Sequence, residues 1–376
     1  MKILVAGHNV RHIACSASRA GHQVFALGCY CDLDLIKSVH EAIKLDADVM
    51  SSKKGIEYIK KSIEIYLEDR LPEAMILGPG VEELDFETLK FNGLKILNNS
   101  SPKISQVSDK FWLANWLKKR GYPTIRTQIA KDSHDLNGYP VMVKPRKGAG
   151  GAENRLIWDE IDLARLKDDF IVQEWITGRP SSVSVIANGK EAIAIAVNEQ
   201  LMGISWLGTK GFQYCGNITP LEASVEDLTK MAKMAENIAT DLKLMGSNGV
   251  DFLLTSNGPV VVEVNPRFQG SLDAVEMATK MNIFQAHILS FEGVLPQKPK
   301  SFRPAGRAVL FAKDDLKITK DLSEIRWISD IPKKDVCIKK GDPISSILAT
   351  GNNRKDVVDL LKSRSATMSQ ECHMEI

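Results

Sequence analysis

Three polar residues interrupt an apolar segment late in the chain, and two of them are of types that bind divalent cations. The segment VVVEVNPRFQGSLD carries Glu263, Asn265 and Arg267. Glu263 and Asn265 stand two positions apart, so in a strand both side chains point to one face of the sheet. Asp251 opens the preceding apolar segment, and the turn SNG between the two predicts a hairpin that can bring it opposite them. Two carboxylates and an amide oxygen suit Mg²⁺ or Mn²⁺, and Arg267 can bind a phosphoryl oxygen. A half-exposed hairpin with a polar outer face is the alternative interpretation.

A glycine-rich segment, PVMVKPRKGAGGAEN, is the second candidate site. A predicted strand carries Lys144, and Gly148, Gly150 and Gly151 follow within a few positions. The backbone N–H groups of such a loop can bind phosphate, and a lysine adds a positive charge. No GK[ST] sequence closes the loop, so it is not a Walker-type P-loop. A hairpin tip without a ligand is the alternative.

A third segment, FIVQEWITGRPSSVSV, places polar groups at the end of a predicted apolar strand. Gln173 and Glu174 end this strand, and Ile176 follows them shortly before a turn at Gly178. Polar groups that leave a sheet in this way can bind the edge of an adenine base. An exposed hairpin rim explains the pattern equally well.

Other polar residues are candidates for contact with a second substrate. Asn217 and Thr219 lie in the polar segment GTKGFQYCGNITPLE, for which an ordinary surface loop is the alternative, and Ser271 follows the metal-binding hairpin. Arg11 follows the first predicted strand, and ligands favour the carboxyl edge of open sheets. Its guanidinium can pair with a substrate carboxylate, although a polar helix start is the alternative.

The elements that must position these residues predict an α/β fold. A strand over 2–6, a helix over 10–20 and a strand over 23–27 begin an open α/β domain, which lacks the glycine fingerprint of dinucleotide-binding enzymes. We expect an N-terminal open α/β domain, a central domain of two α+β lobes, a small β-rich domain and a disordered tail. The expected bounds are 1–105, 106–300 with a lid lobe at about 123–178, 301–363, and 364–376.

The composition excludes several classes of protein. The 376 residues are 44% hydrophobic and 26% charged, with a net charge of +2, so we expect no nucleic-acid or membrane partner. No apolar run approaches the roughly 20 residues that span a bilayer. The six cysteines do not form two pairs at zinc spacing, which favours a reduced, cytoplasmic protein.

In their order and spacing, the three segments resemble the ATP-grasp superfamily over about residues 105–300. The whole chain more weakly resembles its biotin-carboxylase-like branch, and within it archaeal-type predicted ATP-dependent carboligases. The resemblance implies an α+β ATP-grasp fold that uses ATP with Mg²⁺ or Mn²⁺. It also implies site residues: Lys110, Lys144, Gly148, Gly150 and Gly151 at the ATP phosphates, Gln173, Glu174 and Ile176 at adenine, Asp251, Glu263 and Asn265 at the metal, and Asn265 and Arg267 in catalysis.

The activity that this resemblance implies is an ATP-dependent carboxylate–amine ligase. Such an enzyme forms an acylphosphate from a small carboxylate, which an amine then attacks, and releases ADP and phosphate. A carboxylase or small-molecule kinase on the same fold, and a non-catalytic ATP-binding regulatory protein, are the alternatives. The outer domains in this branch often form dimers, so a homodimer is expected. Pro180 or Ser181 replaces an acidic residue that often binds ribose, and no segment resembles a biotin or bicarbonate site.

Overall fold

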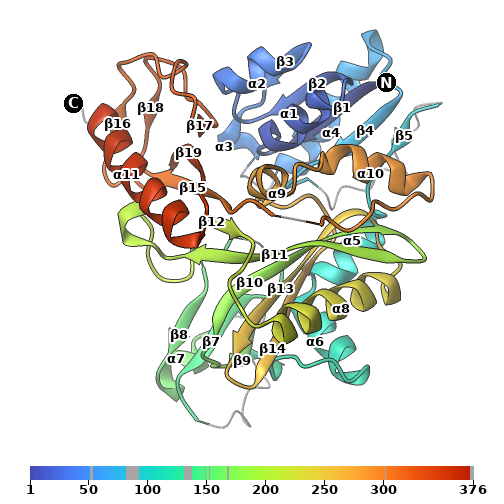
Figure 1. Cartoon of the computed structure of the whole chain (residues 1–376), viewed down its shortest axis with the longest axis vertical. Helices are drawn as coiled ribbons and strands as arrows, with labels where there is room; N and C mark the ends of the chain where they lie inside the picture. The colour runs from blue at the N-terminus through green and yellow to red at the C-terminus, as the bar shows by residue number, and fades with distance from the viewer. Residues whose placement is uncertain are drawn as a thin grey trace.

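The computed structural model describes residues 1–50, 54–81, 93–130, 138–148, 150–151, 153–166, 169–300 and 302–372. Its strands form an N-terminal sheet, a four-stranded sheet, a long central sheet and one isolated pair. In Figure 1 the N-terminal sheet lies at the top, the central sheet crosses the middle and the four-stranded sheet lies at the bottom. No helix of the described residues is both long enough and apolar enough to cross a membrane.

The N-terminal sheet is parallel and has the order β3-β2-β1-β4-β5. Its strands are β1 (Lys2–Gly7), β2 (Gln23–Gly28), β3 (Glu41–Lys44), β4 (Ala74–Leu77) and β5 (Lys95–Ile96), and its helices are α1 (Arg11–Arg19), α2 (Leu33–Ser38), α3 (Ala47–Met50) and α4 (Gly55–Asp69). Alternate residues of β1 enter different cores, since Ile3 packs in one cluster and Leu4 in another. Both faces are therefore covered, as parallel sheets require. The open α/β start that the sequence predicts is confirmed.

The four-stranded sheet is antiparallel and has the order β6-β9-β7-β8. It contains β6 (Thr127–Ile129), β7 (Val141–Pro145), β8 (Arg155–Ile157) and β9 (Phe170–Glu174), with the short helix α7 (Glu160–Ala164) between β8 and β9. Two helices precede it, α5 (Ser101–Ser108) and α6 (Lys110–Lys119). The sheet is small, so its core holds only a few side chains, among them Val141, Val143 and Val172.

The central sheet has eight strands in the order β14-β13-β10-β11-β12-β15-β19-β17. Its first five strands in the chain are β10 (Arg179–Asn188), β11 (Ala192–Met202), β12 (Tyr214–Thr219), β13 (Met245–Thr255) and β14 (Gly258–Asn265). A 3₁₀ helix lies at Ser205–Leu207, and three α-helices cover the sheet: α8 (Val225–Asp241), α9 (Leu272–Thr279) and α10 (Ile283–Phe291). Met231 and Ile238 of α8 pack on Val250, whereas Phe284 of α10 packs on the opposite side together with Ile3 of the N-terminal sheet.

The C-terminal region is rich in strands, as expected. Its longer strands, β15 (Ala305–Phe311) and β19 (Pro343–Thr350), and the short β17 (Ile328–Ser329) extend the central sheet, whereas β16 (Leu316–Lys317) and β18 (Cys337–Ile338) pair apart from it. The expected disordered tail is wrong over 364–372, because α11 (Arg354–Cys372) continues through it. Leu361 and Met368 are fully buried along one face of α11, which gives this helix a reason to form; residues 373–376 lie outside the described residues.

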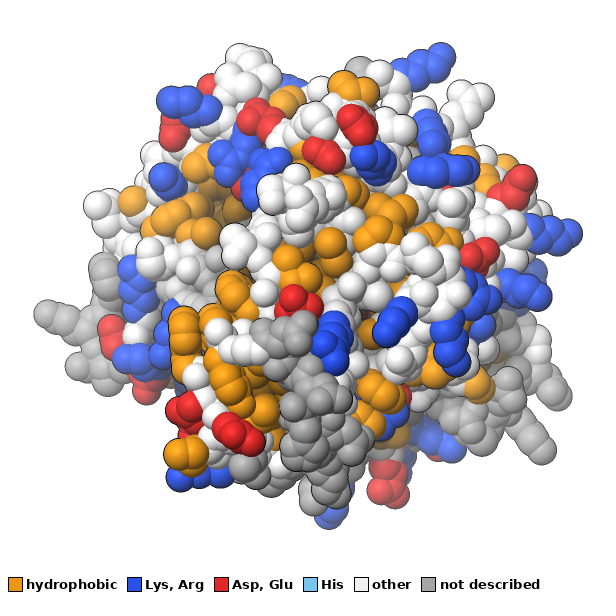
Figure 2. All heavy atoms as spheres, turned by 90° about the horizontal axis from the view of Figure 1, so that it is seen from below, with side chains coloured by type: hydrophobic (Ala, Val, Ile, Leu, Met, Phe, Trp, Pro, Cys, Tyr) orange, Lys and Arg blue, Asp and Glu red, His pale blue; other side chains and the backbone are white. Residues whose placement is uncertain are grey.

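Charges of both signs are spread over the face of the molecule that is seen from below. On this face, basic and acidic side chains stand among hydrophobic ones (Figure 2). This distribution agrees with the net charge of +2.

Gly216 in β12 occupies a backbone position that excludes a side chain. Its φ is +141°, and an added Cβ would lie 2.1 Å from the carbonyl oxygen of Arg307 in β15. Gly258 also has a positive φ, +105°, but nothing lies within 4 Å of its added Cβ. A substitution at Gly258 therefore introduces backbone strain alone, whereas one at Gly216 introduces both backbone strain and a clash between strands.

We expect Gly216→Ala to destabilise the protein more than Gly258→Ala. Both substitutions place a side chain at an unfavourable φ, which costs about 1–3 kcal/mol. Gly216→Ala also overpacks the space between β12 and β15, which destabilises the protein by about a further 1–3 kcal/mol. Urea denaturation of the two variants measures the difference, and equal loss of stability in both would contradict this explanation.

Candidate functional site

A cavity of about 500 Å³ lies where the four-stranded sheet meets the central sheet. Met142 and Lys144 of β7 contribute to one wall, and residues of β13 and β14 contribute to another. The linker from Trp175 to Gly178, which joins the two sheets, also lines it. The cavity thus collects side chains from segments that lie far apart in the sequence.

The β13–β14 hairpin places two carboxylates side by side. Asp251 pairs directly with Glu263, and Asn265 follows on the same face of β14. Asp251 accepts hydrogen bonds from Asn265 Nδ2 at 3.0 Å and from Gln200 Nε2 at 3.1 Å. Burial, followed by the nearby charge of Glu263, raises the pKa of Asp251 to about 7. The two carboxylates therefore repel each other and favour a cation between them.

Positive groups surround this pair. Lys110 Nζ lies 3.4 Å from Glu263 Oε1 and donates a hydrogen bond of 2.6 Å to the carbonyl oxygen of Gly148. Burial lowers the pKa of Lys144 to about 8, against the opposing effect of Glu263. Arg267 Nη2 reaches Asn265 Oδ1 at 3.4 Å. Two lysines and an arginine thus surround a patch of carboxylate and amide oxygens.

The start of α6 fixes Lys110 against the glycine-rich segment. Asp109 caps the helix by accepting hydrogen bonds from the N–H groups of Phe111 and Trp112, both at 3.1 Å. The same carboxylate pairs with Arg146 at 2.5 Å, and the Lys110 N–H donates to the carbonyl oxygen of Arg146. Cap, ion pair and backbone bond together hold the lysine near the cavity.

The glycine-rich segment touches the loop that leads into β12. The N–H of Tyr214 donates to the carbonyl oxygen of Gly150 at 3.1 Å. Gly151 has a φ of +71°, and a Cβ added to it would lie 2.3 Å from the carbonyl oxygen of Phe212. This close approach requires glycine, so the segment closes over the cavity only with glycine at this position.

Gln173 provides an unpaired acceptor near the cavity. It pairs with Met142 across β7 and β9, and direct partners in a sheet share a face. Its side chain is 3% exposed, and its Nε2 donates to Thr127 Oγ1 at 2.8 Å. Its Oε1 has no partner within the described residues. A buried amide oxygen without a donor fits a ligand that supplies an N–H group.

The comparisons with known proteins identify the family of the domain that contains much of this cavity. The family model described as "ATP-grasp domain" matches residues 107–271. The chain contains an ATP-grasp domain. ATP with Mg²⁺ is the cofactor pair of ATP-grasp enzymes, and the resemblance to this superfamily is confirmed.

Relatives and solved structures extend the similarity. The chain is 28% identical over 370 residues to "Uncharacterized protein MJ0776" of Methanocaldococcus jannaschii, covering 94% of this chain and 89% of that protein. It is 28% identical over 195 residues to the D-alanine--D-alanine ligase of Pediococcus pentosaceus, covering 48% of this chain and 54% of that protein. The structure of biotin carboxylase from Campylobacter jejuni matches with a TM-score of 0.78 at 19% identity, covering 98% of this chain and 95% of that one. This last similarity shows that the chain shares the fold of that structure over nearly its whole length.

The ATP-grasp domain and its neighbours bring most of the predicted site residues to the cavity. Those that line it are Lys144, Gly150, Gly151, Ile176, Asn217, Asp251, Glu263, Asn265, Arg267 and Ser271. Lys110 and Gly148 are bonded to each other beside Glu263, and Gln173 lies next to Met142 on the neighbouring strand. The side chain of Glu174 is exposed, so only its backbone is suited to a contact with adenine.

Two predicted substrate residues lie away from the cavity wall. Thr219 is fully buried and donates to Asn198 Oδ1 at 2.6 Å. Arg11 is 3% exposed, and its guanidinium is bonded to Asp273 and Asp330. Both side chains are occupied by protein partners, and neither lines the cavity.

Gln200, Tyr214 and Gln269 line the cavity but are absent from the predicted site. Gln200 reaches Asp251 because β10 brings β11 and β13 into one sheet. Nothing in the sequence around Gln200 indicates this pairing, whereas Tyr214 lies within the polar segment that the sequence singles out.

The donor set fits a magnesium ion that completes its coordination with phosphate and water oxygens. Among the described residues, no group of three or more His, Cys, Asp or Glu side chains is placed to hold a metal. Asp251, Glu263 and the amide oxygen of Asn265 supply few protein ligands, which is the usual arrangement for Mg²⁺ bound with a nucleotide.

We expect the affinity for Mg²⁺ with a non-hydrolysable ATP analogue to be greatest between about pH 7 and pH 8. Below this range Asp251, whose pKa is raised to about 7, becomes protonated and loses its value as a ligand. Above it Lys144, whose pKa is lowered to about 8, loses the charge that attracts phosphate. The affinity should fall by up to about tenfold per pH unit on either side.

Calorimetric titration from pH 5.5 to pH 9.5 measures this profile. In Lys144→Arg the decrease at high pH should disappear, because arginine keeps its charge. An affinity that is independent of pH in the wild-type protein would contradict these roles.

Proposed function

We propose that the protein is an ATP-dependent carboxylate–amine ligase that acts through an acylphosphate and releases ADP and phosphate. The observation that carries the proposal is the Asp251–Glu263 pair, which faces Lys110 and Lys144 in the cavity of an ATP-grasp domain. This pattern of charge suits a nucleoside triphosphate with its metal, because the carboxylates bind the cation and the lysines bind the phosphates.

In this proposal each end of ATP meets a different set of residues. Asp251, Glu263 and Asn265 hold Mg²⁺, which offsets the charge of the phosphates when bound. The unpaired Oε1 of Gln173 accepts a hydrogen bond from the adenine amino group, and Ile176 contacts the base. Lys110 holds Gly148 at its carbonyl oxygen, so the glycine-rich segment lies beside the phosphates with its N–H groups available to them.

Transfer of the phosphoryl group requires a positively charged hydrogen-bond donor to its oxygens and a site from which water is excluded. Arg267 lines the cavity next to Asn265, where its guanidinium holds an oxygen of the transferred phosphoryl group. The carboxylate oxygen of the substrate attacks the γ-phosphorus, and the bond to the bridging oxygen of ADP breaks. The contact of Gly150 and Gly151 with the loop before β12 excludes water, which protects the acylphosphate until an amine attacks it.

The part of the cavity near β12 supports small polar substrates. Tyr214, Asn217 and Ser271 line it with neutral hydrogen-bonding groups, of which Asn217 already accepts from Tyr214 and donates to Thr219. Such groups can orient a carboxylate or an amine without competing for the metal. We assign this part of the cavity to the acyl donor and the amine.

The similarity to a ligase favours this reaction over its alternatives. D-alanine--D-alanine ligase is a relative by sequence over 195 residues, whereas the similarity to biotin carboxylase at 19% identity concerns the fold. A carboxylase, a small-molecule kinase and a regulatory ATP-binding protein remain the outcomes that the experiment must distinguish. The homodimer, and the division at residue 105 with a lid lobe over about 123–178, stay predictions.

Acylphosphate trapping tests the proposal. The protein is incubated with Mg-ATP, hydroxylamine and pools of small carboxylates, and hydroxamate and ADP are measured together. We expect hydroxamate that depends on one carboxylate, in equal amount to ADP. ADP that requires bicarbonate would indicate a carboxylase, and a stable phosphorylated product would indicate a kinase. Nucleotide binding without ADP in any pool would contradict the ligase.

We expect Glu263→Gln and Asn265→Ala each to lower ADP formation by at least about 100-fold, because the first removes a carboxylate charge from the metal site and the second removes an amide oxygen. Glu226→Gln is the matched control, since Glu226 lies on α8 and pairs with Lys230 on the surface. Turnover in the metal-site variants equal to that of the control would remove the metal assignment.

A further inference from the structure

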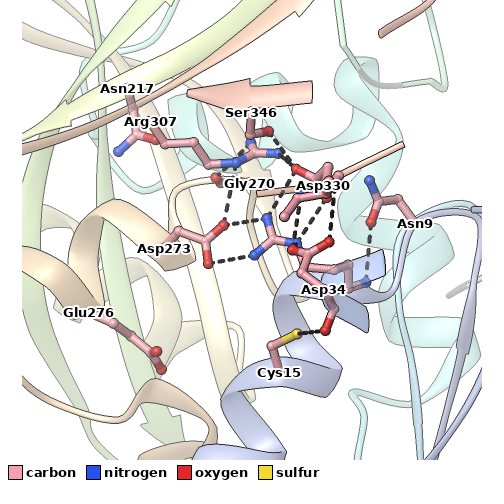
Figure 3. Close-up of polar contacts among 12 residues, drawn as sticks. Asn9, Cys15, Asp34, Asn217, Gly270, Asp273, Glu276, Arg307, Asp330 and Ser346 are labelled. Carbon is pink, nitrogen blue, oxygen red and sulfur yellow. Dashed lines mark hydrogen bonds and ion pairs between the residues drawn. The ribbon is translucent and has the colours of Figure 1, made fainter. Parts of the chain in front are cut away.

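Four buried charges form a network next to the cavity. Arg11 of α1 binds Asp273 of α9 through two hydrogen bonds, of 3.0 and 2.6 Å. It also binds Asp330, which follows β17, at 2.9 and 3.0 Å. Arg307 of β15 completes the set at 3.0 Å from Asp330 and 3.4 Å from Asp273. Figure 3 shows Asp273, Arg307 and Asp330 converging from three different elements.

The network is largely shielded from water. Its two arginines and two aspartates are each at most 13% exposed, and Asp34, which is 22% exposed, adds a third carboxylate 3.6 Å from Arg11 Nε. Burial alone would raise the pKa of Asp330, but Arg11 and Arg307 hold that pKa well below its usual range. Both aspartates are therefore ionised at neutral pH, since Arg11 likewise keeps the pKa of Asp273 low against its burial.

The turn at Asp330 is held in an unusual conformation. Its φ is +54°, a region that aspartate tolerates better than most side chains. Asp34 of α2 accepts the N–H groups of Asp330 and Ile331, both at 3.0 Å, and Ser346 Oγ donates to Asp330 Oδ2 at 2.5 Å. The N-terminal region and β19 thus both fix this carboxylate.

Arg307 connects the network to the wall of the cavity. Arg307 Nη1 donates to the carbonyl oxygen of Gly270 at 3.3 Å, and Gly270 lines the cavity. Asn217, another lining residue, is the direct partner of Arg307 across β12 and β15. A side chain added at Gly270 would meet the ring of Tyr214 at 3.3 Å, so this ring lies over the turn that Arg307 holds. The network and the proposed second-substrate end therefore share one wall.

Stability alone does not explain four buried charges. A buried ion pair loses the hydration of both ions and is often no more stabilising than apolar side chains of similar size. What such a network does supply is a fixed geometry, because each guanidinium donates to its carboxylates only in certain orientations. Here it fixes three segments from distant parts of the chain against the wall at Gly270 and Ser271.

We propose that Arg11 and Asp330 are positioning residues for the second-substrate end of the cavity, acting through Arg307 and Asp273. The inference rests on the proposed function. Arg307 donates a hydrogen bond to the Gly270 carbonyl. Asp273 lies in the first turn of α9, directly after Ser271, so its ion pairs fix the position of this turn. Arg11 and Asp330 keep these two residues in place. The network does not touch the Asp251–Glu263 pair, so it affects the second substrate and leaves nucleotide binding unchanged.

The tyrosines allow a test that requires no knowledge of the substrate. The protein contains six tyrosines, and labelling with 3-fluorotyrosine gives each a ¹⁹F signal; Tyr214→Phe identifies that of Tyr214. In Asp330→Asn, we expect the Tyr214 signal to shift or split while the affinity for Mg-ADP changes by less than about twofold. The same is expected, more weakly, for Arg11→Lys, which keeps the charge but loses the planar fork.

Glu41→Gln is the matched control. Glu41 also binds an arginine through two hydrogen bonds, from Arg70 at 2.9 Å each, and it accepts a hydrogen bond from Tyr66. This control should move the Tyr66 signal and leave the Tyr214 signal in place. A thermal melt shows whether Asp330→Asn folds. If it does not, Ser346→Ala, which removes one hydrogen bond to Asp330, is used in its place for the same measurement.

The kinetic consequence separates this inference from the proposed function. With a carboxylate that yields hydroxamate, Asp330→Asn should raise its KM about 10- to 100-fold and leave the KM for ATP unchanged. An unchanged Tyr214 signal in a folded variant would overturn the positioning role. So would a loss of Mg-ADP affinity as large as the rise in KM for the carboxylate. If no carboxylate yields hydroxamate, the ligase fails, and the Tyr214 signal still decides the role of the network.

Discussion

The repulsion between Asp251 and Glu263 is the constraint on which the site depends. Directly paired residues on neighbouring strands have Cβ atoms about 5 Å apart, and two like charges at that distance repel by about 3 kcal/mol at an effective dielectric constant of about 20. The hairpin holds both side chains on one face, so the strands cannot separate them. Protonation of Asp251, which its raised pKa favours, relieves the repulsion in the free protein, and a cation relieves it when one binds.

The positive groups around this pair come from elements that the fold must bring to it. Lys110 is placed by the capped start of α6, Lys144 by a strand of the four-stranded sheet, and Arg267 by the turn after β14. The four-stranded sheet is attached to the central sheet through the linker that lines the cavity. A relative movement of the two sheets would therefore change the distance of Lys144 from the carboxylates.

The sequence could predict the part of the site that depends on local geometry. Glu263 and Asn265 share a face because they stand two apart in a strand, and the SNG turn specifies the hairpin that brings Asp251 opposite them. The N-terminal sheet was predictable for the same reason, since its apolar runs alternate with an amphipathic helix. The resemblance to ATP-grasp proteins then related the lysines and the glycine-rich segment to the hairpin.

The rest depends on pairings between distant segments. Gln200 reaches Asp251 only through the strand order of the central sheet, and local sequence does not specify that order. Arg11 follows a strand, as a ligand-binding residue would, yet Asp273 and Asp330 occupy its guanidinium, and they lie more than 260 positions away. In α11 the expectation of disorder failed because polar residues surround a narrow apolar stripe, which becomes stable only when Leu361 and Met368 pack on the central sheet.

The most direct test of the account is to locate the metal. Crystals grown with Mn²⁺ and a non-hydrolysable ATP analogue, measured at the manganese absorption edge, give anomalous peaks only at the metal positions. The account predicts a peak in direct contact with oxygens of Asp251 and Glu263 and with phosphate oxygens of the analogue. A nucleotide bound with its metal elsewhere, and no peak at these carboxylates, would contradict it.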